Sequence, residues 1–230
     1  MINIYADGAN LKSLEIHQAN QKISGFTTNP TLMKKSGITD YKQFALDALK
    51  IIRDKPISFE VFADDFENMY RQALLISSWS KNINVKIPIT NTKGESTIRL
   101  IQSLVSENVK LNITAITTLD QVKLVSEVLK PEIFSITSIF CGRIADTGVD
   151  PVPICIKASK MLRKCKSNLL WASPREVLNV KQAEDSGCKI ITLTDELLKK
   201  LDLYGKDLEA FSLETVKMFY NDALDSGFKL

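Results

Sequence analysis

ISFEVFADDFENMYRQALLISSWSKNINVKIPI, residues 57–89, contains the repeating unit from which the fold can be inferred. Its two ends, 57–62 and 84–89, are short runs rich in β-branched and aromatic residues, which predict buried strands. Between them, apolar side chains recur at helical spacing at Phe66, Met69, Ala73 and Ile76. A strand, a helix and a second strand in this order favour parallel pairing through a right-handed crossover.

The same alternation extends in both directions from this unit. Strand-like runs occupy residues 2–6, 25–28, 57–62, 84–89, 111–116, 133–139, 168–172 and 189–193. Their starts lie roughly 20 to 35 residues apart, about the length of a strand plus a helix. Eight such units predict a single-domain α/β fold, the closed (β/α)8 TIM barrel. An open doubly wound sheet is the alternative, but the glycine-rich phosphate turn expected of it is absent from the sequence.

A further helix is predicted at the carboxyl end, so we expect residues 1–230 to form one barrel domain with residues 209–230 as an added helix. Ser212 is its expected N-cap. An apolar stripe follows at Leu213, Val216, Phe219, Tyr220 and Leu224. This stripe either covers the barrel or meets another subunit.

Composition narrows the classes of function. The 230 residues carry a net charge of +3 without a concentrated basic stripe, so we expect no nucleic-acid partner. No secretory signal and no apolar run long enough to span a bilayer is visible, which predicts a cytoplasmic protein without a membrane partner. One histidine, His17, and four scattered cysteines argue against a zinc site and favour a reduced compartment.

In a (β/α)8 barrel the chemistry lies at the carboxyl ends of the strands, so polar residues there are candidates for a site. In chain order these candidates are Asp7, Thr27, Thr28, Asn29, Glu60, Lys86, Asn112, Thr114, Ser138, Arg143, Ser173 and Arg175. Two acids, a lysine, two asparagines and several hydroxyls therefore converge on one barrel mouth.

Lys86 is the most informative of these residues because it interrupts the apolar run Asn-Val-Lys-Ile-Pro. A poorly hydrated site disfavours the charged form of a lysine, and the neutral amine can attack a ketone to form a Schiff base. Asp7 and Glu60 are then candidate acid–base groups. Each residue also has a plain structural reading: Lys86 as a snorkelling surface lysine, Asp7 as a helix cap, Glu60 as half of an ion pair.

Taken together, the motifs resemble those of the transaldolase family. Thr27-Thr28-Asn29-Pro30 is similar to the family's Thr-Thr-Asn-Pro signature, and Val85-Lys86-Ile87-Pro88 is similar to its Schiff-base lysine motif. Further matches in the same order are Asn112-Ile113-Thr114, the segment 138–143 and Ala172-Ser173-Pro174-Arg175. The resemblance extends from the first strand to the eighth.

The resemblance implies a transaldolase, which transfers a dihydroxyacetone unit between sugar phosphates in the pentose phosphate pathway without metal or cofactor. Lys86 would form the imine, Asp7 would move the proton of the C4 hydroxyl, and Glu60 with Thr114 would position a water. The substrate-binding residues would be Thr28, Asn29, Asn112, Ser138, Phe140, Arg143, Ser173 and Arg175, with the two arginines and Ser173 on the phosphate. Sugar phosphates and a homo-oligomeric assembly are the implied partners.

The family has a second branch, the fructose-6-phosphate aldolases, which release free dihydroxyacetone. By resemblance, Glu60 and Phe140 match the transaldolase branch, whereas the chain length is nearer the aldolase branch. Gly8, Ile139 and Pro174 depart from the family's usual residues, and Pro174 lies between two expected phosphate ligands. Another class I sugar aldolase and a catalytically inactive sugar-phosphate-binding protein are the alternatives.

Overall fold

The computed structural model describes residues 2–229 and contains a closed barrel of eight parallel strands. Each strand pairs with the next along the chain, and β8 pairs with β1 from Asn3↔Ile190 to Asp7↔Thr194, which closes the ring. The strands are β1 (Asn3–Asp7), β2 (Ile23–Thr27), β3 (Ile57–Glu60), β4 (Ile83–Pro88), β5 (Leu111–Ile116), β6 (Ser135–Ile139), β7 (Asn168–Trp171) and β8 (Ile190–Thr194). The predicted TIM barrel is confirmed, and no strand boundary differs by more than two residues from its predicted run.

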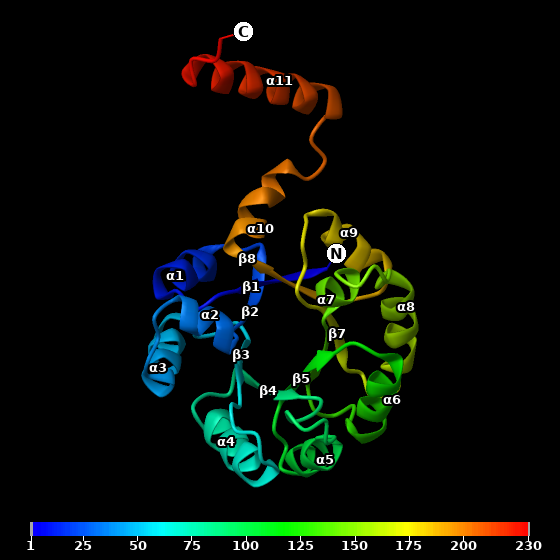
Figure 1. The fold of residues 1–230 in the computed structure, drawn as a ribbon. Helices are drawn as coiled ribbons and strands as arrows, with labels where there is room; N and C mark the ends of the chain where they lie inside the picture. Colours follow the sequence, from blue (N-terminus) through cyan, green and yellow to red (C-terminus); the bar gives the residue numbers. More distant parts are fainter. Residues whose placement is uncertain (1, 230) are drawn as a thin grey trace. The chain divides into compact units, whose positions relative to one another are not determined.

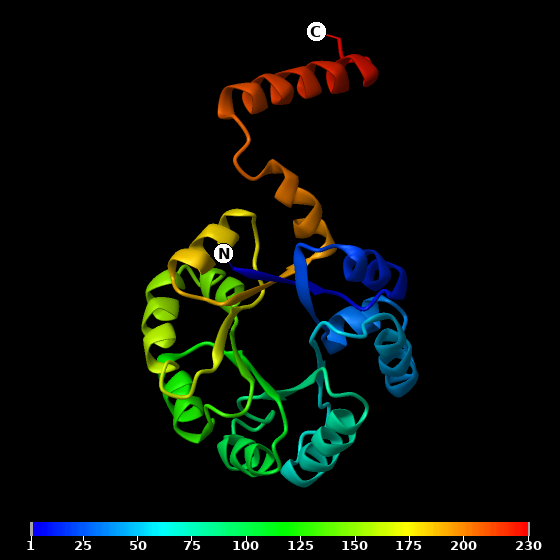
Figure 2. The ribbon, with the colours of Figure 1, turned by 180° about the vertical axis from the view of Figure 1, so that it is seen from behind.

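Helices surround the ring of strands, as the two opposite views in Figures 1 and 2 show. They are α1 (Leu11–Ala19), α2 (Pro30–Lys35), α3 (Tyr41–Ile51), α4 (Phe66–Ser78), α5 (Ile98–Ser106), α6 (Leu119–Val128), α7 (Cys141–Ala145), α8 (Val152–Met161), α9 (Leu178–Asp185) and α10 (Asp195–Lys200). Two connections contain an additional short helix, α2 after β2 and α7 after β6. Both begin directly at a strand's carboxyl end, where the candidate residues lie.

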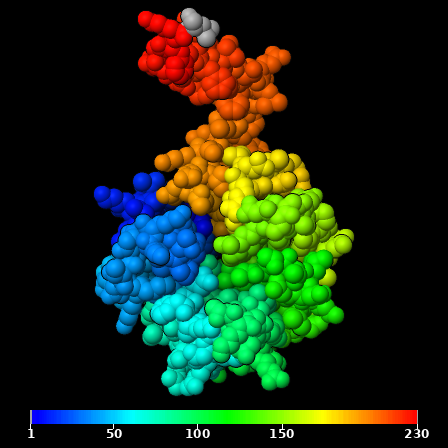
Figure 3. Space-filling view, in the orientation of Figure 1, coloured from blue at the N-terminus to red at the C-terminus, as the bar shows by residue number. Residues whose placement is uncertain are grey.

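The alternation of side chains along each strand separates a hydrophobic layer from the barrel interior. On β4, Ile83, Val85 and Ile87 are buried on one face, whereas Asn84 and Lys86 alternate with them on the other. Part of the interior is apolar and contains Tyr5, Ile136, Leu170, Ala172 and Ile190. Side chains fill the ring that the ribbon outlines, so Figure 3 shows no open channel through the barrel.

A close contact inside the barrel explains one glycine. Tyr5 and Gly25 are paired across β1 and β2, and a Cβ atom at Gly25 would lie 2.5 Å from the Tyr5 ring. Only glycine leaves room for this ring, which helps to fill the interior below the site. Burial of the Tyr5 hydroxyl raises its pKa to about 12, so this ring stays neutral.

The chain divides into two compact units, of which the second begins at Lys199. This second unit contains the 3-10 helix η1 (Leu201–Leu203) and helix α11 (Leu208–Asp225), and α10 crosses the boundary. The expected N-cap at Ser212 is wrong, because α11 begins earlier and Asp207 accepts a 2.8 Å hydrogen bond from the Ala210 N–H. A single domain over residues 1–230 stays a prediction. Among the described residues, no helix combines the length and apolarity needed to cross a bilayer.

Candidate active site

A pocket of about 400 Å³ lies at the carboxyl ends of the strands, and side chains from all parts of the barrel line it. Of the predicted site residues, those that line it are Asp7, Thr27, Asn29, Glu60, Lys86, Asn112, Thr114, Ser138, Phe140, Arg143, Ser173 and Arg175. The structure therefore brings together every predicted site residue except Thr28. A volume of this size suits a small-molecule ligand.

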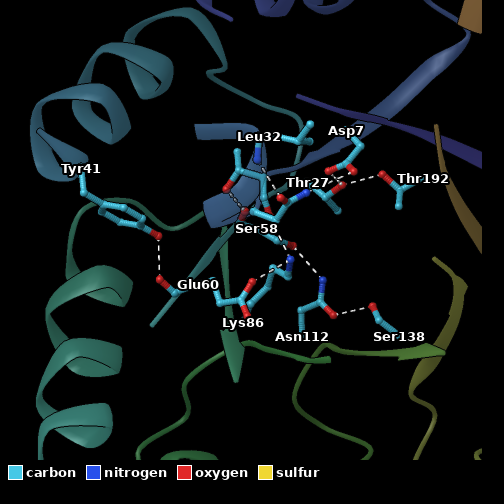
Figure 4. Close-up of polar contacts among 12 residues, drawn as sticks. Asp7, Thr27, Leu32, Tyr41, Ser58, Glu60, Lys86, Asn112, Ser138 and Thr192 are labelled. Atoms are coloured by element: carbon cyan, nitrogen blue, oxygen red, sulfur yellow. Dashed lines mark hydrogen bonds and ion pairs between the residues drawn. The ribbon is translucent and has the colours of Figure 1, made fainter. Parts of the chain in front are cut away.

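Lys86 lies deep in this pocket, with only 7% of its surface exposed. Its Nζ atom is 3.0 Å from Glu60 Oε2 (Figure 4). It also donates a 2.8 Å hydrogen bond to the Thr28 carbonyl. The strand neighbours are apolar and buried as expected, but the amine itself has polar partners. The Glu60 carboxylate is the contacting group that can accept a proton from this amine.

The paired strands account for this contact, since Glu60 and Lys86 are register partners across β3 and β4. Tyr41 fixes the backbone at the same point by donating a 2.7 Å hydrogen bond to the Glu60 carbonyl (Figure 4). Burial raises the pKa of Tyr41, so its phenol keeps the proton that it donates in this hydrogen bond. The ion pair is therefore positioned by sheet register rather than by a flexible loop.

Asp7 occupies the end of β1, in a network of hydroxyl groups. Thr27 Oγ1 donates a 2.8 Å hydrogen bond to Asp7 Oδ1 and is itself in contact with Thr192 Oγ1 (Figure 4). Asn29 Nδ2 lies 3.5 Å from the other carboxylate oxygen. Desolvation by burial raises the pKa of Asp7, and the positive charge of Lys86 and the Thr27 hydrogen bond oppose that rise. Burial thus favours the protonated form of Asp7.

Asn112 is held in one orientation by a row of hydrogen bonds across the barrel floor. Its Nδ2 donates to Ser58 Oγ at 3.1 Å, and its Oδ1 accepts from Ser138 Oγ at 2.6 Å. All three side chains are buried, so the row crosses from β3 through β5 to β6 (Figure 4). An amide with both ends occupied in this way cannot rotate freely and presents a fixed face to a ligand.

Thr114 is buried on the same strand as Asn112, but its hydroxyl has no hydrogen-bond partner within the described protein. The next residue, Ala115, has the left-handed φ of 61°, where the pairing of β5 with β6 shifts register between Ile113 and Ile116. A left-handed alanine costs about 1 kcal/mol or more and is typically retained at functional sites. The unpaired hydroxyl therefore marks a position for a water molecule or a ligand.

The outer rim of the pocket is formed by the connections after β6 and β7. Gly142 allows their close approach, because a Cβ atom there would lie 1.6 Å from the Ser173 carbonyl oxygen. Ser173 itself has a left-handed φ of 59°. The guanidinium of Arg143 lies 5.7 Å from the centre of the Phe140 ring, a cation–π contact at the pocket wall. Arg143, Ser173 and Arg175 thereby meet at the mouth.

Thr28 differs from the prediction, because its side chain does not line the pocket. Its hydroxyl is buried and donates a 2.9 Å hydrogen bond to the Ser58 carbonyl, while its own carbonyl accepts from Lys86. Sequence reasoning also missed Thr192 and Thr194, which line the pocket from β8. The alternation of β8 places both on the interior face, and extending the inspection of strand ends to the eighth strand would have found them.

No metal centre accompanies these groups in the part of the chain that the structure describes, where no set of three or more His, Cys, Asp or Glu side chains is arranged to hold an ion. The four cysteines are free thiols and are buried. The single histidine, His17, has its Nε2 2.8 Å from Asp195 Oδ1. Neither feature lies in the pocket lining.

The fold and pocket define a (β/α)8 barrel protein with a buried lysine–carboxylate pair at the carboxyl ends of its strands. The family model described as transaldolase/fructose-6-phosphate aldolase matches residues 4–229. The chain therefore belongs to the transaldolase/fructose-6-phosphate aldolase family of enzymes, which act on sugar phosphates. This membership confirms the resemblance noted in the sequence motifs.

Curated relatives carry the name "probable transaldolase". The one from Carboxydothermus hydrogenoformans is 33% identical over 87% of this chain and 90% of its own length, and that from Dehalococcoides mccartyi is 30% identical with the same coverage. Among solved structures, a 3-hexulose-6-phosphate synthase superposes with a TM-score of 0.59, covering 84% of this chain and 90% of its own. At 12% identity that likeness concerns the fold alone.

Proposed function

We propose that this protein is a transaldolase that transfers a dihydroxyacetone unit between sugar phosphates through a Schiff base on Lys86. The observation that carries the proposal is the buried Lys86 amine, 3.0 Å from the Glu60 carboxylate and within electrostatic range of Asp7. Family membership and the relatives at about 30% identity support it. A lysine flanked by two carboxyl groups in different environments is suited to stepwise proton transfer.

Imine formation begins with transfer of a proton from the Lys86 ammonium to Glu60. The neutral amine then adds to the C2 carbonyl carbon of a ketose phosphate, and a proton passes from the attacking nitrogen to the carbonyl oxygen, which gives a neutral carbinolamine. Glu60 returns a proton to this hydroxyl, which leaves as water, and a protonated imine remains. The unpaired Thr114 hydroxyl is suited to hold that water, and the steps run in reverse for product release.

Carbon–carbon cleavage uses Asp7. The Asp7 carboxylate accepts the proton of the C4 hydroxyl while the C3–C4 bond breaks, and the bonding electrons move into the iminium to form an enamine on Lys86. The aldehyde fragment leaves, an acceptor aldehyde takes its place, and Asp7 returns the proton as the new bond forms. A raised pKa suits a carboxyl group that must hold a proton between these two events.

The remaining side chains of the pocket would orient the substrate. Asn29, Asn112 and Ser138 would hold the hydroxyl groups of the dihydroxyacetone part, and the locked row around Asn112 supports that role. Arg143, Ser173 and Arg175 would bind the phosphate at the rim, where forked guanidinium hydrogen bonds suit a phosphate group. Residence in the pentose phosphate pathway, a cytosolic location and a homo-oligomeric assembly stay predictions.

Two alternatives compete with this proposal. An aldolase of the family's second branch would release free dihydroxyacetone, and the lack of a hydroxyl on Phe140 favours the transferase. A protein that only binds sugar phosphates would need the rim arginines, but it would gain nothing from burying Lys86 beside Glu60, because a buried ion pair is costly to desolvate.

A coupled assay tests the proposal against both alternatives. With fructose 6-phosphate and erythrose 4-phosphate, a transaldolase produces glyceraldehyde 3-phosphate and sedoheptulose 7-phosphate only when both substrates are present. An aldolase produces free dihydroxyacetone from fructose 6-phosphate alone. A protein that binds fructose 6-phosphate in calorimetry and yields neither product would contradict the proposed activity.

A further inference from the structure

The rim of the pocket contains an ion pair that the proposed chemistry does not use. Arg175 donates from Nε to Asp146 Oδ1 at 3.2 Å and from one terminal nitrogen to Asp146 Oδ2. Asp146 follows α7 directly, whereas Arg175 lies in the connection between β7 and α9. The pair therefore joins the two connections that form the phosphate end of the pocket.

The geometry of the pair leaves part of the guanidinium available. A guanidinium has five N–H groups in one plane, and the two bonds to Asp146 use the Nε–H and one terminal N–H. Three N–H groups remain, including those on the edge between the two terminal nitrogens. An arginine held by a carboxylate along one edge can thus present a second edge to an anion.

Arg175 needs a partner to fix its orientation, because both side chains of the pair are largely open to solvent. Arg175 and Asp146 have 52% and 55% of their side-chain surfaces exposed. A solvent-exposed arginine without a partner samples many rotamers and loses that freedom when it binds a ligand. Asp146 removes much of this cost in advance by selecting one orientation of the guanidinium plane.

We infer that Asp146 is a positioning residue for phosphate recognition: it orients Arg175 so that the free edge of the guanidinium faces a phosphate group in the pocket. The inference rests on the proposed function, since it takes the rim as the phosphate end. The opposite effect also has a physical basis, because a carboxylate beside an arginine repels a phosphate. If Asp146 mainly orients Arg175, replacing it weakens phosphate binding; if it mainly repels phosphate, replacing it tightens phosphate binding. The substitution Asp146→Asn therefore separates the two effects.

The test measures the dissociation constant of inorganic phosphate by calorimetry, together with the KM values of erythrose 4-phosphate and of unphosphorylated erythrose. For Asp146→Asn we expect the phosphate constant and the KM of erythrose 4-phosphate each to rise about five- to tenfold, with the KM of erythrose unchanged. Asp185→Asn is the matched control, since the pair Lys181–Asp185 on α9 has the same exposed fractions and lies outside the pocket lining.

The Arg175→Ala variant tests whether Asp146 acts on phosphate binding through Arg175. In Arg175→Ala, adding Asp146→Asn should leave phosphate binding unchanged or tighten it slightly, because only the repulsion remains. The inference is overturned if Asp146→Asn alone tightens phosphate binding or leaves the dissociation constant of phosphate unchanged. It is also overturned if Asp146→Asn weakens phosphate binding equally in the wild type and in the Arg175→Ala variant.

Failure of the proposed function gives a different result. If Arg143→Ala weakens phosphate binding while Asp146→Asn does not, the phosphate end is correct and the positioning role is wrong. If the wild type neither binds inorganic phosphate nor distinguishes erythrose 4-phosphate from erythrose, the phosphate end and the inference both fail.

Discussion

The inner and outer ends of the pocket are built in different ways. At the inner end, Lys86, Glu60 and Asn112 project from neighbouring strands, and sheet register and buried hydrogen bonds fix their positions. At the outer end, Arg143 and Arg175 extend from connections after the strands and are exposed to solvent. Their placement depends on a cation–π contact and an ion pair rather than on a ladder of backbone hydrogen bonds.

This difference suggests a division of labour. A catalytic group must be held within a fraction of an ångström of its productive position, and strands provide that rigidity. A phosphate-binding group tolerates more variation, because charge attraction acts over a longer range and phosphate offers several equivalent oxygens. Substitutions at the inner end should therefore affect the rate of chemistry, and those at the outer end should affect the choice of substrate.

The largest effect is expected from Lys86→Met, which removes the amine and keeps an unbranched side chain. Loss of the nucleophile should lower kcat/KM for transfer by about 10⁴-fold or more. Borohydride with fructose 6-phosphate should add the donor mass to the Lys86 peptide of the wild type and leave the variant unlabelled. Lys110→Met, at a lysine whose amine donates to the Lys81 carbonyl outside the pocket lining, is the control that should label normally. Labelling that survives Lys86→Met would place the imine elsewhere.

Asp7→Asn should have the next largest effect on the rate, about 10²- to 10⁴-fold in kcat, because the amide cannot accept the C4 hydroxyl proton. Imine formation does not need that step, so borohydride labelling of Lys86 should continue. Mass spectrometry of the labelled peptide together with stopped assays separates the two steps. A variant that turns over normally would exclude Asp7 from cleavage.

The same variant should be more stable than the wild type near neutral pH. Because the pKa of Asp7 is raised by burial, its native state binds a proton more tightly than its unfolded state, so the residue's contribution to stability falls as pH rises above about 4. The neutral amide introduced by Asp7→Asn would carry no such penalty. The melting temperature of the variant should therefore exceed that of the wild type at pH 7, and the difference should shrink toward pH 4. A difference that grows on acidification would contradict the raised pKa.

Arg143→Ala should have an intermediate effect and tests the outer end. Loss of a charge-assisted hydrogen bond of about 1.5–3 kcal/mol should raise the KM of erythrose 4-phosphate by about 10- to 150-fold. The KM of unphosphorylated erythrose and the rate of imine formation should change little, since the inner end remains intact. If the KM values of both acceptors rise equally, Arg143 supports the structure of the rim through Phe140 and does not recognise phosphate.

The location of Lys86, Glu60 and Asn112 at the inner end could be predicted from the sequence, for a physical reason. A strand's period of two and the rule that barrel chemistry lies at carboxyl ends convert sequence positions such as Lys86 and Asn112 directly into positions in space. What the sequence does not encode locally is the partner of each group. The ion pair of Lys86 with Glu60 depends on the register between two strands, which no local pattern specifies.

The outer end and the carboxyl-terminal helix were less predictable. Arg175 and Asp146 are separated by 29 positions, and their segments meet through the pairing of β6 with β7 and the tight approach of Gly142 to the Ser173 carbonyl. Thr28 was predicted to bind the substrate because it belongs to a sequence motif. In the structure its carbonyl accepts from Lys86 and its hydroxyl is buried, so its side chain is not directed at the ligand. At the carboxyl-terminal helix, Asp207 rather than Ser212 is the cap, because it accepts the hydrogen bond of the Ala210 N–H and α11 already begins at Leu208.

The smallest effect is expected at Phe140, where the inner and outer ends meet. Its ring packs against the apolar cluster of the barrel and also lies under the Arg143 guanidinium. The added hydroxyl in Phe140→Tyr could hold a water or donate a proton near the enamine, which would favour its release as free dihydroxyacetone. We expect a few-fold rise in the ratio of dihydroxyacetone released to sedoheptulose 7-phosphate formed. Phe140→Leu keeps an apolar side chain without a hydroxyl, so it should reduce stability and leave this ratio unchanged. If both variants shift the ratio alike, packing rather than the hydroxyl controls the fate of the intermediate.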